Sequence, residues 1–268
     1  MINYFRMDMR RILRSRWFYI TLGVIVLLLL FSFFMIKLAL DPELIGQLSK
    51  AGITVSTSVD EVSDAKQLMG ASMESLIGSM LFSGGMMVSI IVIISSILVC
   101  EDFRSGFVKN LFSCRIKRGH YIFGKMLAFF AVNVIYMAVF ILVILGLNKL
   151  MGFNISLGSP KHLLMMIGAG CLIITALIAQ NLLFCMLTRN AIAGSVLSIL
   201  CGAGVISGAI QAIAGLFNAD LSPFLLGEML RGLPYMEKFS AQSIAAAVLW
   251  LAAYTGASAF ILNKKDIA

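Results

Sequence analysis

The stretch WFYITLGVIVLLLLFSFFMI, residues 17–36, runs for twenty residues without a charged side chain. A helix needs about 20 apolar residues to cross a hydrocarbon core of about 30 Å, so this stretch predicts a transmembrane helix. Five further uncharged windows of similar length follow along the chain, at 76–99, 126–147, 163–187, 191–214 and 243–262. We therefore expect an all-α, polytopic membrane protein with six transmembrane helices.

The composition of the whole chain supports this interpretation. Of the 268 residues, 60% are hydrophobic and only 13% are charged, and the mean hydropathy is +0.98. A water-soluble domain is about half apolar and about a quarter charged. A soluble fold could not bury this much apolar surface, and the length fits a single transmembrane domain over residues 1–268.

The basic residues predict the orientation, because Lys and Arg are retained on the cytoplasmic side of a membrane. With the N-terminus inside, the inner segments hold 14 of the 21 basic residues and four of the 13 acidic ones. The outer segments then hold the other seven basic and nine acidic residues. An even number of spans returns the C-terminus to the cytoplasm, and the net charge of +8 is better explained by topology than by nucleic-acid binding.

Four segments between the spans differ in character. Residues 1–16 predict an amphipathic interfacial helix, in which arginines oppose the apolar residues Ile2, Phe5, Met9, Ile12 and Leu13. Residues 41–75 form an acidic extracellular loop, with some helix near 65–75. Residues 100–125 form the main cytoplasmic loop. Residues 215–242 contain two prolines in a piece too short to span, which predicts a re-entrant or outer helical hairpin.

Few residues offer catalytic or metal-binding chemistry. The chain has two histidines and no H-E-x-x-H pattern, and its five cysteines form no C-x-x-C pair. Gly119 to Lys125 match the core of a phosphate-binding loop, but Met126 replaces the Ser or Thr that would bind Mg²⁺, and no strand precedes the motif. We therefore expect no catalytic residue, no metal site and no cofactor bound by this chain.

Polar and small residues inside the spans leave two interpretations open. Asn133, Thr175, Gln180, Asn181 and Gln211 can tie helices together or line a substrate path. Two rows of small residues at four-residue spacing predict close helix packing in the fifth span. They are Gly194, Ser198 and Gly202, followed by Gly204, Gly208 and Ala212.

The cytoplasmic loop reads EDFRSGFVKNLFSCRIKRGHYIFGK over residues 101–125. Its apolar side chains lie near helical spacing and are flanked by charges. A short amphipathic helix of this kind can enter the groove of a partner protein, or it can lie on anionic lipid.

The chain resembles the permease subunit of type-2 ATP-binding-cassette (ABC) transporters, the mostly exporting class. That family has an interfacial N-terminal helix, six spans, and a loop after the second span with a glutamate, a glycine about five residues later and a basic, aromatic and lysine run. The matching residues here are Glu101, Gly106, Leu111, Arg118, Tyr121 and Lys125. Phe107 and Cys114 stand where the family often has threonine and proline.

The resemblance implies that this loop couples to a separate ATPase subunit, which would hold ATP and Mg²⁺. The implied coupling residues are Glu101, Phe103, Gly106, Phe107, Leu111, Arg118, Tyr121 and Lys125. A second permease copy would complete a homodimer in a bacterial plasma membrane, and the substrate would be an amphipathic peptide, lipid-like molecule or drug. The alternatives are a membrane-embedded enzyme and a structural or sensory subunit that transports nothing.

Overall fold

The computed structural model describes residues 2–41, 72–83, 85–113, 118–153, 155–156, 158–217, 219–235 and 241–264. Across these ranges the regular structure is entirely helical, and no strand occurs in them. The prediction of an all-helical fold is thus confirmed for this part of the chain. Most of the predicted outer loop at 41–75 lies outside the described residues.

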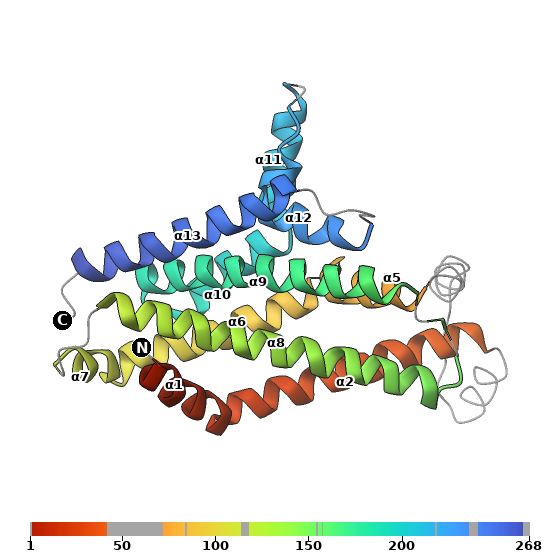
Figure 1. The fold of residues 1–268 in the computed structure, drawn as a ribbon, viewed down its shortest axis with the longest axis horizontal. Helices are drawn as coiled ribbons and strands as arrows, with labels where there is room; N and C mark the ends of the chain where they lie inside the picture. The colour runs from red at the N-terminus through yellow and green to blue at the C-terminus, as the bar shows by residue number, and fades with distance from the viewer. Residues whose placement is uncertain are drawn as a thin grey trace.

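Four long helices form the body of a bundle (Figure 1): α2 (Arg16–Leu40), α8 (Arg118–Leu150), α9 (Pro160–Thr188) and α13 (Ala241–Lys264). Each is long and apolar enough to cross a membrane, and each contains one of the predicted spans. Helix α9 lies at the centre, where it packs against α6, α8, α10 and α13. The chain therefore has the lengths and apolar surfaces of a helical membrane protein.

The other two predicted spans are interrupted. Helix α5 (Met73–Gly78) and the π-turn η1 (Ser79–Ser83) lead into α6 (Met86–Arg104) at 42°, and α10 (Ala191–Gly202) leads into α11 (Val205–Gly215) at 45°. At the breaks Gly85 and Gly204 have φ angles of +61° and +76°, which glycine adopts without the strain that other residues would incur. The described residues thus hold four single spans, or up to six when each bent pair counts as one.

The segment after α11 folds back on the bundle as short helices. A 3₁₀ turn, η2 (Ser222–Phe224), precedes α12 (Leu226–Gly232) and a second 3₁₀ turn, η3 (Leu233–Tyr235). Helix α12 packs against α9, α10, α11 and η1. These short helices lie within 215–242, where the sequence predicts a re-entrant or outer helical hairpin, and residues 218 and 236–240 lie outside the described part.

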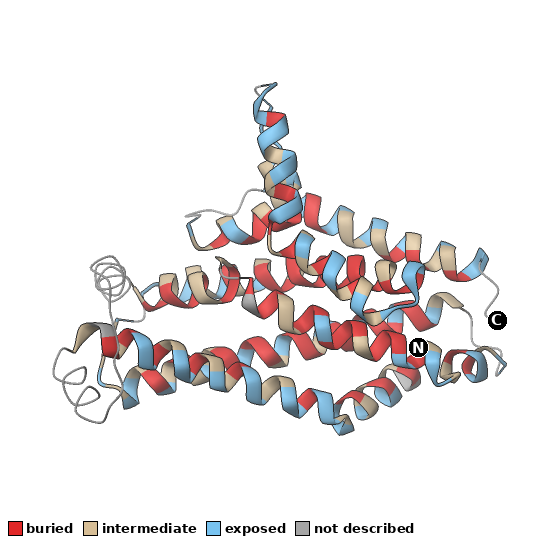
Figure 2. Cartoon of the chain, turned by 180° about the vertical axis from the view of Figure 1, so that it is seen from behind, coloured by how far each residue is buried: buried red, intermediate tan, exposed pale blue. Residues whose placement is uncertain are grey.

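Helix α11 projects from the side of the bundle and is mostly exposed (Figure 2). The exposed side chains on this helix and just beyond it include Val205, Ile213, Leu216 and Phe217. By contrast, Gly194 and Gly202 on α10 are packed so closely that an added Cβ would lie 2.6 Å from the side chains of Cys185 and Val88. The first predicted small-residue row is therefore a packing surface, whereas the second row belongs to a largely exposed helix.

Candidate functional site

Three segments that are distant in sequence meet at one end of the bundle, which we call the basic end (Figure 1). They are α1 (Ile2–Arg14), the last turn of α6 with α7 (Phe107–Ser113), and the first turns of α8. Helix α13 also ends here, because Arg118 of α8 donates hydrogen bonds to the carbonyl oxygens of Leu262 (2.7 Å) and Asn263 (2.9 Å).

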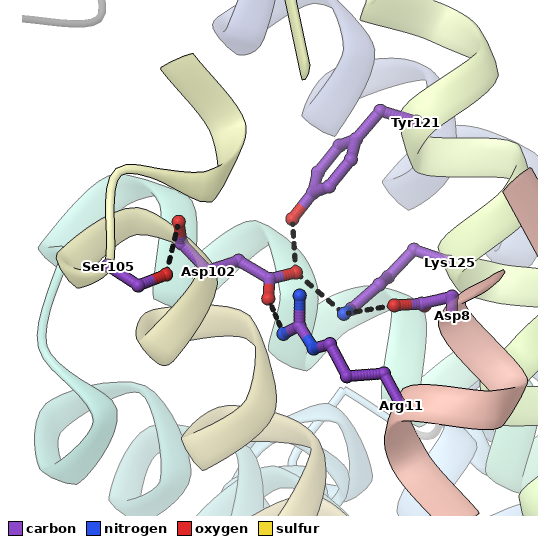
Figure 3. Close-up of polar contacts among 6 residues, drawn as sticks. All are labelled: Asp8, Arg11, Asp102, Ser105, Tyr121 and Lys125. Carbon is purple, nitrogen blue, oxygen red and sulfur yellow. Dashed lines mark hydrogen bonds and ion pairs between the residues drawn. The ribbon is translucent and has the colours of Figure 1, made fainter. Parts of the chain in front are cut away.

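Asp102, at the end of α6, is the acceptor that joins these segments (Figure 3). It is fully buried, and its carboxylate accepts hydrogen bonds from the Lys125 ammonium at 2.7 Å and the Tyr121 hydroxyl at 3.1 Å. The Arg11 guanidinium of α1 also donates to it. One aspartate therefore binds α6, α8 and α1 together through charge-assisted hydrogen bonds.

Lys125 extends the same network to a second carboxylate. Its ammonium lies 3.3 Å from Asp8 of α1, and the side chains of Lys125, Asp8 and Asp102 are all completely buried. Arg11 and Lys125 balance the two aspartates, so this group of charges is formally neutral. We call Asp8, Arg11, Asp102, Tyr121 and Lys125 the charged cluster. Removing one member would leave a buried charge without its partner, which is strongly destabilising.

The sequence of α1 explains how this helix reaches the cluster. Tyr4, Asp8 and Ile12 follow one another at four-residue spacing and form its buried face. The Tyr4 ring lies directly over Gly124, where an added Cβ would come within 2.2 Å of it. Burial, and then the nearby Asp8 carboxylate, raise the pKa of the Tyr4 hydroxyl well above its ordinary value. The hydroxyl therefore stays neutral, and α1 docks by both packing and charge.

A surface groove of about 710 Å³ runs between α1 and the α6–α7 turn. Its lining includes three arginines on one wall and a glutamate and a phenylalanine on the other. The Arg11 guanidinium lies 4.7 Å from the centre of the Phe107 ring, in a cation–π contact. The full lining is Arg10, Arg11, Arg14, Ser15, Leu98, Glu101, Ser105, Phe107 and Asn110.

The eight predicted coupling residues fall into three groups. Glu101 and Phe107 line the groove. Gly106 forms the turn between α6 and α7 with a φ of +69°. The other five contact the rest of the bundle. Phe103 and Leu111 pack on the core, Arg118 binds α13, and Tyr121 and Lys125 lie within the charged cluster.

Sequence reasoning missed Asp8, Arg11 and Asp102 as site residues. A usable signal was present for Asp8, because it is the only acid among the first 16 residues, five of which are arginines. Its place at four-residue spacing between Tyr4 and Ile12 marks it as part of an apolar face. The stretch 119–125, which resembles a phosphate-binding loop, forms the first two turns of α8.

A second polar group, which carries no charge, lies deeper in the bundle. The Asn181 amide nitrogen of α9 donates to the Ser95 hydroxyl (2.6 Å) and the Val92 carbonyl (3.1 Å) on α6. Its amide oxygen accepts from Ser96 at 2.9 Å and from Ser198 of α10 at 3.0 Å. We call Asn181 and these three serines the amide cluster. They tie helices together, as one of the two interpretations of Asn181 predicts.

Comparison with protein-family models, curated proteins and solved structures gives no match to this chain. Among the described residues, no group of three or more His, Cys, Asp or Glu side chains is placed to hold a metal ion. The groove and the charged cluster behind it are the features of the described residues that bear on function.

Proposed function

We propose that this chain is the membrane subunit of an ATP-driven exporter of the type-2 ABC class, with ATP hydrolysed by a separate subunit. The groove at the basic end is the observation that carries the proposal. It combines exposed charge, an aromatic side chain and a short helix, which are features of a surface that receives a partner protein. Two of the predicted coupling residues, Glu101 and Phe107, lie on it.

The charged cluster gives the groove a mechanical role. A force that the ATPase subunit applies at Glu101 or Phe107 would act on the α6–α7 turn. Asp102 connects this turn to α1 and α8 by accepting hydrogen bonds from three side chains. Because buried ion pairs are costly to separate, these helices would move as one body. Rigid-body motion of this kind is how alternating-access transporters work.

The proposal includes a topology and an assembly. Each bent helix pair would count as one span, which gives six spans and places both termini in the cytoplasm of a bacterial cell. Two copies of this chain and two ATPase subunits would form the transporter in the plasma membrane. The substrate would be an amphipathic molecule, and the chain itself would bind no nucleotide.

Co-purification tests the proposal directly. The tagged chain is expressed with ATP-binding subunits from its host, and the retained subunit and its ATP hydrolysis are measured. We expect Glu101→Lys and Phe107→Ala to weaken the complex about tenfold, or about 1.4 kcal/mol. The matched controls are Asp220→Lys, the same charge reversal on the loop after α11, and Phe123→Ala, a truncation of an exposed phenylalanine on α8.

Two results would overturn the proposal. One is that no ATP-binding subunit is retained by the wild-type chain under conditions in which the chain stays folded. The other is that the two groove variants retain the subunit and its ATP hydrolysis as well as the two controls do.

A further inference from the structure

The break between α10 and α11 is held by two charged residues of α12. The Arg231 guanidinium donates to the Ala203 carbonyl, at the end of α10 where the helix dipole is negative. Glu228, three residues earlier, accepts a hydrogen bond from Ser207 at 3.2 Å, in the first turn of α11 where the dipole is positive. Each charge therefore faces the helix end that it stabilises, and the break is a built feature of the fold.

The residues at the break between α10 and α11 are also closely packed. Gly204 has a φ of +76°, which other residues rarely adopt, and an added Cβ on Gly227 would lie 2.7 Å from the Cys201 carbonyl oxygen. Two glycines are thus needed for α12 to reach the break. Discontinuous helices clamped in this way form the substrate sites of many transporters.

A cavity of about 160 Å³ opens beside the break. Five segments of the chain contribute to its wall, among them both halves of the broken span and the aromatic face of α13. The side chains with polar or aromatic groups are Gln180, Cys201, Ser207, Phe224, Trp250 and Tyr254.

The chemistry of this wall favours a positive charge. The rings of Trp250 and Tyr254, which both line the cavity, are stacked 5.2 Å apart at 17°, and the indole N–H donates to the Phe224 carbonyl at 2.8 Å, so the indole has its electron-rich ring, and not its N–H, to offer a ligand. No Lys, Arg or His of the described residues lines the cavity. Glu228 lies at its edge, bonded to the lining hydroxyl of Ser207 and in no ion pair within the described part of the chain.

The size of the cavity limits what it can hold. An apolar cavity of about 150 Å³ in another protein accepts a benzene molecule, so this one has room for a single ring or a trialkylammonium group. The rest of a larger ligand would have to extend past α11, whose outer face is apolar and exposed.

We propose that this cavity binds the ammonium group of an amphipathic organic cation, with Trp250 and Tyr254 against the cation and Glu228 as its counter-charge. This assignment rests on the proposed function, since it names the class of molecule that the exporter would carry. Binding itself needs no ATPase subunit and can be measured on this chain alone.

Fluorescence of Trp250 provides the test, because the chain has only two tryptophans. The Trp17→Phe variant in lipid nanodiscs leaves Trp250 as the sole reporter, and it is titrated with benzyltrimethylammonium and with its uncharged carbon isostere, neopentylbenzene. We expect saturable binding of the cation, weakened at least about tenfold by Glu228→Gln, with less than twofold change for the isostere. Asp220→Asn removes an exposed carboxylate from the preceding loop and is the matched control.

A second variant covers the case in which Glu228→Gln disturbs the fold. Tyr254→Leu keeps the apolar volume of the wall and removes the ring, so it should also weaken binding of the cation more than binding of the isostere. The cation-site proposal is overturned if the Trp250 signal does not saturate with the cation, or if cation and isostere respond equally to both variants. Cation binding by a chain that retains no ATPase subunit would instead overturn the exporter proposal and leave the site standing.

Discussion

The charged cluster and the amide cluster join helices of the same bundle by opposite chemistry. The charged cluster connects α1, α6 and α8 with two buried acids and two bases, whereas the amide cluster connects α6, α9 and α10 with one asparagine and three serines. The charged cluster lies at the end of the bundle, and the amide cluster lies within it. In an apolar medium a charge is far more costly to bury than an amide, so each buried aspartate lies beside a base, although Oδ2 of Asp8 has no hydrogen-bond partner among the described residues.

This contrast has a functional meaning under the exporter proposal. A rigid charged cluster beside the groove would let α1, α6 and α8 transmit force from the partner subunit without changing their relative positions. An uncharged cluster can exchange one hydrogen bond for another as helices slide, because two of its three serines also bond their own helix backbone: Ser95 and Ser96 donate to the Val92 carbonyl at 2.9 Å. The two clusters should therefore differ sharply in their response to mutation.

Lys125→Met should give the largest effect. Among the described residues it leaves the buried Asp8 without an ion pair and the buried Asp102 with Arg11 alone, and we expect a loss of about 3–5 kcal/mol in the free energy of unfolding. The measurement is thermal or denaturant unfolding in mixed micelles. Lys149→Met, at an exposed position near the other end of α8, is the control and should change stability by less than about 0.5 kcal/mol.

A double variant sharpens this result. Adding Asp102→Asn to Lys125→Met removes one acid with the base and restores formal neutrality between Asp8 and Arg11. We expect the double variant to be less destabilised than the sum of the two single variants, by at least about 1 kcal/mol. Strict additivity would mean that Asp102 and Lys125 are not energetically coupled, and the rigid connection behind the groove would then be refuted.

Gly124→Ala should have the next largest effect. The new methyl group would meet the Tyr4 ring, so α1 must shift, at a cost of about 1–3 kcal/mol. Gly146→Ala, at an open position on the same helix, is the control and should be neutral or slightly stabilising. Limited trypsin digestion reports on α1 itself, which carries exposed Arg6, Arg10 and Arg14: cleavage there should speed up only in Gly124→Ala. Equal cleavage rates in both variants would show that α1 does not depend on this contact.

Part of this structure was predictable from the sequence, for a physical reason. Long apolar windows predict helices that are long enough to cross a membrane, and the four long helices α2, α8, α9 and α13 each contain one such window. The break at Gly204 was not foreseen in the window 191–214, because hydropathy averages composition and takes no account of the φ angle of one glycine. The small-residue row from Gly194 to Gly202 was identified, since close packing leaves a compositional trace.

The charged cluster was harder to predict. Lys125 was predicted as a coupling residue because it matches the loop motif of the permease family that the chain resembles. Its burial depends on Asp102, 23 positions earlier, and Asp8, 117 positions earlier, and no local pattern shows that these chain segments meet. Pairings at such sequence distance are determined by tertiary packing, which is why only Tyr121 and Lys125 of the cluster, and none of its contacts, were predicted from the sequence.

Of the three single substitutions, Asn181→Leu in the amide cluster should lower the free energy of unfolding least. The change removes four hydrogen bonds to neighbouring helices and one from the Cys185 thiol of α9 itself, yet Ser95 and Ser96 keep their bonds to the Val92 carbonyl and no charge is left unpaired. Side-chain hydrogen bonds between membrane helices contribute about 0.6 kcal/mol each on average, and the added apolar surface of leucine offsets part of their sum, so we expect a loss of about 1–2 kcal/mol. Asn263→Leu, exposed at the end of α13, is the control for the gain in apolar surface. If Asn181→Leu cost as much as Lys125→Met in the same unfolding assay, the two clusters would be equally rigid, and charge would not be what distinguishes the part of the bundle behind the groove.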